Sequence, residues 1–317
     1  MKLHKIALID FDTDFFDKQY LNRIKSLTKK LIFVKELNIK KRNNLIKDAS
    51  ALLIRYSTSL DKAALDNTSN LKYIGASSIA VDQVDTKHAH EKGINITNIP
   101  GYSSNPIAEF VFGALIDHFR HLAESKKNVE QGDFTVHTEY KGWELAGKTF
   151  GIIGLGNIGK RVAEIALGFN MKVQYYSRTR KKDYEKMEVK YVPLEKLIST
   201  SNILGVFLEL NNKTKNFVTE KYLNHIKKST IVISTSHTDI FDFDALTKSL
   251  IENKFIFAQT YFDSISKEHR DRLHKSPNTI LYPSIAIQTF ETKKRQQEMV
   301  VNNLENFCRG KIINEVT

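Results

Sequence analysis

The stretch Thr149-Phe-Gly-Ile-Ile-Gly-Leu-Gly-Asn-Ile-Gly159 decides the fold of this chain. An apolar run of β type comes first, a Gly-x-Gly-x-x-Gly turn follows, and an amphipathic helical pattern continues over 160–169. A strand, a glycine turn and a helix in this order are typical of a dinucleotide-binding unit. Gly154 allows the tight turn, and Gly159 lets the helix pack closely against the strand.

We expect this turn to bind the pyrophosphate of a dinucleotide. Gly156 lets the backbone approach the phosphates, and Asn157 and Ile158 open the helix, whose free N–H groups favour anions. Together with Gly154 they form the predicted phosphate-binding set. The alternative is a glycine-rich turn without a ligand, and the register of strand, turn and helix favours the dinucleotide.

The residues after the next predicted strand, 172–176, decide between NADPH and NADH. A carboxylate usually binds the adenosine ribose there, whereas this chain has Ser177, Arg178, Thr179 and Arg180. Guanidinium and hydroxyl groups form charge-assisted hydrogen bonds with a 2′-phosphate. The alternative is a polar loop whose arginines face solvent. The sequence predicts a preference for NADPH over NADH.

Outward from this turn, short β-type runs alternate with helical patterns along most of the chain. Such alternation predicts an α/β fold, with two Rossmann-like doubly wound domains and an interdomain cleft. We expect a substrate-binding outer domain in 1–102 plus 289–317, and a dinucleotide-binding domain in 103–288. Pro106 is predicted to open one long helix that runs to about Gly132.

Length and composition agree with a two-domain protein. The chain has 317 residues, of which 41% are hydrophobic and 26% charged, as in globular proteins. A single cysteine, Cys308, excludes an internal disulfide framework and fits a reducing compartment. Neither a signal peptide nor an apolar run long enough to cross a membrane is evident. We expect a soluble cytoplasmic protein without a membrane partner.

The net charge of +12 permits binding to nucleic acids but does not require it. The basic residues are mostly lysines spread along the chain without interleaved aromatics, which favours a solvated surface over a nucleic-acid face. The histidine pairs lack a third ligand, so structural roles are favoured over a metal site. These pairs are His88 with His90 and His118 with His121. A run of aspartates at 239, 242 and 244 predicts a cap for the following helix.

Several motifs give the chain a resemblance to the D-isomer-specific 2-hydroxyacid dehydrogenases, which include the glyoxylate/hydroxypyruvate reductases. The resemblance covers nearly the whole length, and it is carried by Ala51–Arg55, Leu71–Gly75, Val81–Asp85, Gly93–Gly101, Ile107–Glu109, Gly142–Gly159 and Asn302–Phe307. It implies two Rossmann-like domains, the outer one closed by the C-terminal helix, and a homodimer built around the cofactor domain. It also implies a small-molecule substrate.

The family's three catalytic positions are all substituted. Family members use an Arg to bind the substrate carboxylate, a His to protonate the reduced carbonyl, and a Glu to orient that His. The matching residues are His237 at the Arg position, Ile265 at the Glu position and Ser284 at the His position. A serine hydroxyl is too weak an acid at neutral pH, and isoleucine orients nothing. The resemblance therefore implies non-standard catalytic residues.

Other side chains are candidates for the site. His237 is the predicted general acid, assisted by Ser236, Ser284 or Tyr282, because imidazole titrates near neutrality. Its alternative role is structural. Substrate binding is expected from residues that match the outer domain's substrate-facing loop and the interdomain segment: Arg55, Ser78, Ile79, Ala80 and Tyr102. A salt bridge at the rim of the site is the alternative for Arg55.

Two functions of different class follow from the sequence. The first is an NAD(P)-dependent oxidoreductase that acts on CH–OH or C=O groups of an unidentified substrate through non-standard residues. The second is a catalytically silent NAD(P)-binding pseudoenzyme, a sensor or a scaffold. The glycine motif supports both, and His237 favours the first by a narrow margin.

Overall fold

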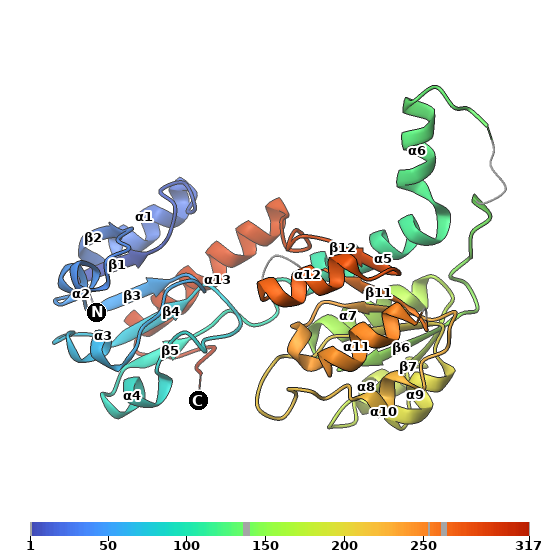
Figure 1. The fold of residues 1–317 in the computed structure, drawn as a ribbon. Coiled ribbons are helices and arrows are strands. Elements are labelled where there is room, and N and C mark those ends of the chain that lie inside the picture. Colours follow the sequence, from blue (N-terminus) through green and yellow to red (C-terminus); the bar gives the residue numbers. More distant parts are fainter. Residues whose placement is uncertain (1, 136–139, 253, 261–264, 317) are drawn as a thin grey trace. The chain divides into compact units, whose positions relative to one another are not determined.

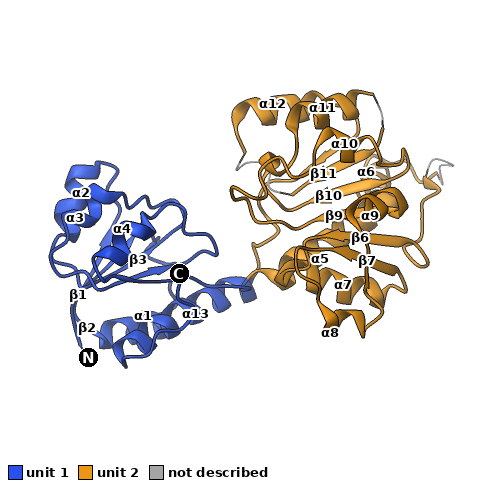
Figure 2. Cartoon of the chain, turned by 90° about the horizontal axis from the view of Figure 1, so that it is seen from below, with its two compact units in different colours: residues 1–102, 290–317 blue, residues 103–289 orange. Residues whose placement is uncertain are grey.

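The computed structural model describes residues 2–135, 140–252, 254–260 and 265–316. The chain divides into two compact units, and each has its own parallel sheet. Unit 1 consists of residues 1–102 and 290–317, and unit 2 of residues 103–289 (Figure 2). Both are α/β layers around a parallel sheet, as in Rossmann-like domains, which confirms the predicted fold class.

Unit 1 contains a five-stranded sheet in the order β2-β1-β3-β4-β5. Its strands are β1 (Leu3–Ile9), β2 (Thr28–Val34), β3 (Ala51–Ile54), β4 (Tyr73–Ala76) and β5 (Asn95–Thr97). Its helices are α1 (Lys18–Ser26), α2 (Ile39–Ile46), α3 (Lys62–Asp66), α4 (Thr86–Glu91) and α13 (Phe290–Cys308). Two apolar clusters flank the sheet, and β1, β3 and β4 are almost entirely buried, as expected for parallel strands covered on both faces.

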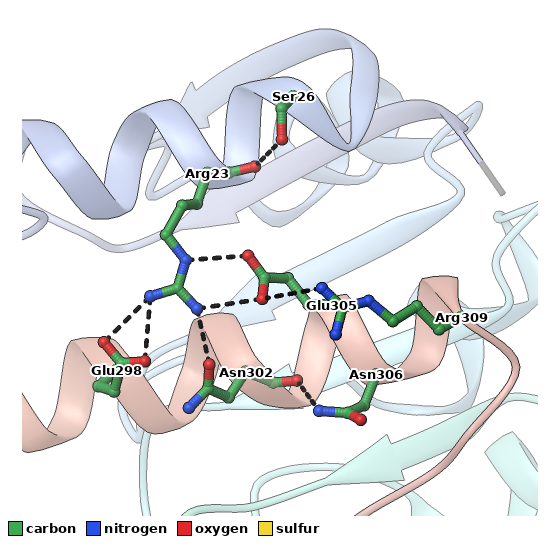
Figure 3. A network of polar contacts seen from close by, with 7 residues as sticks. All are labelled: Arg23, Ser26, Glu298, Asn302, Glu305, Asn306 and Arg309. Carbon is green, nitrogen blue, oxygen red and sulfur yellow. Dashed lines mark hydrogen bonds and ion pairs between the residues drawn. The ribbon is translucent and has the colours of Figure 1, made fainter.

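The C-terminal helix α13 is fixed to α1 by the guanidinium of Arg23 (Figure 3). Its Nη1 donates to both carboxylate oxygens of Glu298 at 3.0 Å, and its Nε donates to Glu305 at 2.9 Å. Because Arg23 bonds to the Glu305 carboxylate, the pKa of that carboxyl is lowered. Phe307 of α13 stacks on Tyr73 of β4 with ring centroids 4.7 Å apart. The last helix therefore completes the core of unit 1.

Unit 2 contains a seven-stranded sheet in the order β12-β11-β10-β9-β6-β7-β8. Its strands are β6 (Thr149–Ile153), β7 (Lys172–Tyr176), β8 (Lys190–Tyr191), β9 (Ile203–Val206), β10 (Ile231–Ser234), β11 (Ile256–Gln259) and β12 (Thr279–Leu281). The chain reverses its direction of progress across the sheet between β6 and β9, which is a topological switch point.

Helices cover both faces of this sheet. On one face pack α5 (Ser104–Arg120) and α7 (Asn157–Gly168). On the other pack α9 (Leu194–Thr200), α10 (Glu220–Leu223), α11 (Phe243–Ile251) and α12 (Lys267–Lys275). The short helix α8 (Lys182–Glu185) follows β7, and the 3₁₀ turn η2 (Thr238–Ile240) follows β10. The sequence patterns had not indicated α8, α9 or α12.

The prediction of one long helix over 106–132 is wrong. Helix α5 ends at Arg120, and α6 (Leu122–Glu130) begins after His121, whose φ of 53° lies in the left-handed region. A residue in that conformation ends the helical hydrogen-bond ladder. No residue of α6 is buried, and the helix stands away from the sheet of unit 2 (Figure 1). None of the helices in the described ranges is long and apolar enough to cross a membrane.

Candidate functional site

The glycine turn between β6 and α7 has the backbone geometry that its sequence predicts. Gly154 has a φ of +97°, and a Cβ there would lie 2.7 Å from the carbonyl oxygen of Phe207. A Cβ on Gly159 would lie 2.2 Å from the carbonyl oxygen of Gly154. Both positions therefore require glycine for the fold itself. At Gly156 a Cβ would meet nothing within 4 Å, so this glycine leaves open space in front of the backbone.

That open space lies at the N-terminus of α7, where a phosphate fits. No side chain caps this end, although α7 has 12 residues. Asn157 is exposed, and Ile158 packs against the apolar cluster between α7 and the sheet. The first N–H groups of a helix lack partners within the helix and favour an anion. The residues present thus suit the pyrophosphate of a dinucleotide.

The loop after β7 has one engaged arginine and one available arginine. Arg180 forms an ion pair with Glu185 at 2.5 Å, and it lies over the ring of Tyr191. Ser177 donates its hydroxyl to the carbonyl oxygen of Thr179 at 2.6 Å, which closes the loop. Arg178 is exposed and has no hydrogen bond or ion pair with any described residue. Arg178 is therefore the guanidinium in this loop that an added phosphate can engage.

His237 follows β10 at the carboxyl end of the sheet and begins the turn η2. Its Nδ1 accepts a hydrogen bond from the backbone N–H of Asp239 at 3.2 Å. The Oδ1 of Asp239 lies 3.4 Å from the same nitrogen. The side chain of His237 is 30% exposed. Neutral His237 carries its proton on Nε2, because Nδ1 is the acceptor in this bond.

A second histidine, His269, meets the same turn from helix α12. Its Nδ1 lies 3.0 Å from the hydroxyl of Thr238 and 3.8 Å from Oδ1 of Asp239. Its ring stacks on Phe243 with centroids 3.5 Å apart, and burial lowers its pKa. In the sequence, a slip of one or two residues in the match to the family would bring Glu268 or His269 near the family's Glu position, although Pro283 fixes the register at Ser284. The available signal was Ser266, which accepts from the N–H of His269 and begins α12, as an N-cap does.

The other positions near the predicted acid differ in what they can do. Ile265 is 3% exposed and packs in the apolar cluster of α9 to α12, so it cannot orient an acid. Ser236 is buried, and its hydroxyl bonds to the backbone of Val206 and Leu208. Its hydrogen bonds therefore hold the β9 and β10 ends together rather than assist His237.

Ser284 and Tyr282 lie beyond β12. Ser284 is partly exposed. Tyr282 packs edge-on against Phe110, and burial together with the charge of Asp117 raises the pKa of its phenol. A raised pKa makes Tyr282 a poorer proton donor.

In unit 1 the predicted substrate residues follow two neighbouring strands. Arg55 follows β3, and its guanidinium lies over the rings of Phe15 at 4.8 Å and Phe11 at 5.8 Å. Within the described part of the chain no carboxylate lies at ion-pair distance from Arg55. The cation is thus held by aromatic faces and has hydrogen-bond donors to spare. The salt-bridge alternative does not describe it.

The loop after β4 carries the remaining candidates. Ser78 donates its hydroxyl to the carbonyl oxygen of Ala80 at 2.7 Å. Ile79 is 36% exposed, and its carbonyl oxygen accepts from Asn98. The carbonyl oxygen of Tyr102 accepts from Arg295 of α13 at 3.0 Å. The loop after β4 and the guanidinium of Arg55 after β3 lie at the same carboxyl edge of the five-stranded sheet.

The histidine pairs have ordinary ion-pair partners. His88 lies 2.7 Å from Asp66, and His121 lies 3.1 Å from Glu124. Within the described ranges no group of three His, Cys, Asp or Glu residues is arranged to hold a metal ion. Asp242 caps α11 through a bond from the N–H of Ala245, as the sequence predicts.

Comparisons with known proteins place these features in a family. The model for "D-isomer specific 2-hydroxyacid dehydrogenase, NAD binding domain" matches residues 112–286. Glyoxylate reductase of Korarchaeum cryptofilum is 33% identical over 272 residues, which are 84% of this chain and 82% of that protein. Glyoxylate reductase of Pyrococcus furiosus is 32% identical over 274 residues, with 84% and 82% covered.

Two solved structures have the same fold. An acyclic imino acid reductase in complex with NADPH and D-arginine aligns with a TM-score of 0.85 at 25% identity. The alignment covers 99% of this chain and 100% of that one. D-lactate dehydrogenase from Aquifex aeolicus, complexed with NAD and lactic acid, aligns with a TM-score of 0.82 at 24% identity and 96% coverage of both chains.

Proposed function

The chain belongs to the D-isomer-specific 2-hydroxyacid dehydrogenase family, and we propose that it reduces the carbonyl of a small 2-oxo acid with His237 as the proton donor. The family relationship makes it an oxidoreductase of CH–OH and C=O groups that uses a nicotinamide cofactor. The observation that carries the proposal is the imidazole of His237 at the carboxyl end of β10, two strands from the glycine turn in the same sheet. Ligands of open α/β sheets bind outside these strand ends, near the switch point.

The reaction needs a hydride at the carbonyl carbon and a proton at the carbonyl oxygen. The nicotinamide cofactor supplies the hydride when it is bound. The imidazolium form of His237 supplies the proton from Nε2, because Nδ1 already faces Asp239. The products are the alcohol and the oxidised cofactor, and His237 regains its proton from water. Ser284 is proposed to assist with a hydrogen bond to the substrate.

A cation must take the place of the arginine that His237 replaces. We propose Arg55 for the substrate carboxylate, because its guanidinium is oriented by aromatic rings and lacks a carboxylate partner among the described residues. The loop of Ser78, Ile79 and Ala80, together with Tyr102, would complete the substrate-binding role of unit 1. In this division of labour unit 2 binds the cofactor.

NADPH is the proposed cofactor in preference to NADH. Support comes from Arg178, whose guanidinium is exposed and without a partner among the described residues, and from Ser177 at the position of the usual acid. Arg180 contributes less, because its guanidinium already bonds to Glu185. The reductase complexed with NADPH is consistent with this preference.

We also propose a cytoplasmic homodimer. Helix α6 buries none of its residues, and its apolar side chains Leu122 and Val129 are half exposed. Phe134, which follows the helix, is 78% exposed. These exposed apolar side chains favour a partner surface, and a second copy of the chain would provide one.

An imine in place of a carbonyl is a second candidate substrate. Its support is the serine at the family's acid position together with the likeness to an imino acid reductase. A protonated imine accepts a hydride and becomes a neutral amine, so it needs no proton donor at nitrogen. The loss of the usual acid is compatible with that chemistry.

A stepwise experiment tests the proposal. Fluorescence titration with NADPH and NADH first establishes the cofactor site. Oxidation of NADPH is then followed with glyoxylate, with hydroxypyruvate, and with each of them plus methylamine to form the imine. Turnover with the oxo acid alone supports the carbonyl reductase, and turnover only with the amine supports the imine reductase. Cofactor binding without any turnover would identify the pseudoenzyme.

A further inference from the structure

We propose that Asp239 is the positioning residue for His237, that it holds the imidazole in both protonation states, and that His269 flanks the Asp239 carboxylate from α12. This inference rests on the proposed function, in which His237 donates the proton. It assigns the task of the missing Glu to an aspartate on a different element, since Ile265 at the family's Glu position is buried among apolar side chains.

Asp239 offers two different groups to one nitrogen. Its backbone N–H lies 3.2 Å from Nδ1 of His237, and its Oδ1 lies 3.4 Å from the same atom. Neutral His237 accepts from the N–H through the lone pair of Nδ1. Protonated His237 has a hydrogen on Nδ1, which repels that N–H and is attracted to the carboxylate. In both states Nε2 points away from Asp239 and remains available to a substrate.

The turn that carries Asp239 is held by hydrogen bonds from a neighbouring segment of the same chain. The carbonyl oxygen of Asp239 accepts from the N–H of Asn216 at 2.7 Å, and that of Ile240 accepts from Val218 at 2.9 Å. Ile240 and Thr238 are fully buried on either side. A positioning group is effective only when its own backbone is held, and this backbone is held on both sides.

His269 completes the arrangement. Its Nδ1 forms a hydrogen bond with the hydroxyl of Thr238 at 3.0 Å and lies 3.8 Å from Oδ1 of Asp239, and its ring is stacked on Phe243. Burial and the nearby charge of Arg272 lower the pKa of His269, while Asp239 and Glu268 oppose that shift. The neutral ring bonds to the hydroxyl of Thr238 through Nδ1 and flanks the carboxylate without placing a second positive charge beside His237.

The neighbouring aspartates have other partners, which sets Asp239 apart. Asp242 caps α11 through the N–H of Ala245, and Asp244 pairs with Arg272 at 2.7 Å. Of the three aspartates in this run, Asp239 is the one that lies within ion-pair distance of the described histidines. Asp242→Asn is thus a matched control, since asparagine keeps the capping oxygen and removes a nearby charge.

Kinetics test the positioning role. With the substrate that turns over, Asp239→Asn should lower kcat by about tenfold or more and leave KM within about twofold, and Asp239→Glu should recover part of the loss. His269→Asn, which keeps a donor at the Nδ1 position, should exceed His269→Phe in kcat. Wild-type values in both Asp239→Asn and His269→Phe would overturn the inference.

A measurement on the free protein separates this inference from the proposed function. Protein labelled with ¹⁵N in histidine should show His237 as the Nε2–H form at high pH, with a single side-chain rotamer from its three-bond couplings. In Asp239→Asn the rotamer should average once the ring is protonated, and in Asp242→Asn it should not. An unchanged rotamer in Asp239→Asn contradicts the inference even if the protein turns over. A wild type with this behaviour but no turnover contradicts the proposed function alone.

Discussion

Two parts of the carboxyl edge of the seven-stranded sheet differ in how they match the family's motifs. At β6 the glycine turn keeps the backbone geometry that suits a dinucleotide, and a Cβ on Gly154 or Gly159 would lie less than 3 Å from a backbone oxygen. At the ends of β10 to β12, the positions that the resemblance matches to the family's three catalytic residues carry His237, Ile265 and Ser284. The glycine turn would bind its ligand through backbone groups, whereas the strand ends would act through their side chains.

This difference shows which parts of a site the fold itself protects. A side chain on Gly159 would meet the carbonyl oxygen of Gly154 at 2.2 Å, so a change there damages the β6–α7 packing as well as cofactor binding. Ile265 illustrates the reverse, because an isoleucine at that position adds to the apolar cluster. Side chains at strand ends can therefore change their chemistry while the cofactor fold persists.

The largest expected effect concerns His237→Asn. Asparagine places an oxygen where Nδ1 accepts from Asp239, so the turn is kept and the proton donor is lost. We expect kcat to fall by about 100-fold, which corresponds to ~2.7 kcal/mol of transition-state stabilisation. Single-turnover kinetics measure the loss, and the NADPH dissociation constant serves as control. A variant with nearly the wild-type rate would remove His237 from the chemistry.

Gly156→Val tests the backbone part of the comparison. A Cβ at this position meets nothing within 4 Å, and the φ of −82° suits any residue, so the fold should be retained. The branched side chain would occupy the space proposed for the pyrophosphate and weaken NADPH binding by about 30-fold, or ~2 kcal/mol. The matched control is Gly168→Ala at the far end of α7, where a Cβ also meets nothing. Equal affinities in both variants would place the cofactor elsewhere.

How far the sequence predicted the molecule depends on the range of the interactions. The strand, turn and helix at 149–169 were predictable because they follow from local periodicity and glycine geometry. The break at His121 was not, because its left-handed conformation interrupts an otherwise continuous helical pattern. Helix α12 was also missed, since it is short and highly polar and only Leu273 is buried.

The candidate site divides in the same way. His237 could be placed from the resemblance, and the loop at 177–180 from its distance along the chain. That His269 meets Asp239 could not be predicted, because 30 residues separate them and the contact depends on how α12 packs against α11. Nor could the sequence distinguish Arg178 from Arg180, whose guanidinium pairs with Glu185 of α8. Pairings of this kind require the folded chain.

Arg178→Ala sharpens the cofactor side of the comparison by isolating one charge. Since Arg178 has no partner among the described residues, its removal should not disturb the loop. We expect NADPH to bind about tenfold more weakly and NADH to bind unchanged, because only NADPH has the 2′-phosphate. Arg180→Ala is the paired variant, and its effect on the NADPH/NADH ratio should be smaller since Glu185 already neutralises that guanidinium. The opposite ranking would assign the phosphate to Arg180.

Ser284 gives the smallest expected effect and the closest test of the substituted side-chain positions. A hydroxyl that only hydrogen-bonds to the substrate contributes ~1 kcal/mol, so Ser284→Ala should lower kcat/KM by about fivefold. Ser284→His would return the family's acid to its usual position, yet it should not rescue His237→Asn. An imidazole there has no carboxylate to orient it, because the matching position is Ile265, 3% exposed within an apolar cluster. Adding Ile265→Glu would bury a charge in that cluster and destabilise unit 2, which thermal unfolding would reveal as a lower Tm. If Ser284→His restored turnover to His237→Asn without Ile265→Glu, an imidazole at position 284 would act as the acid without a glutamate. An acid at the end of β10 would then not be needed.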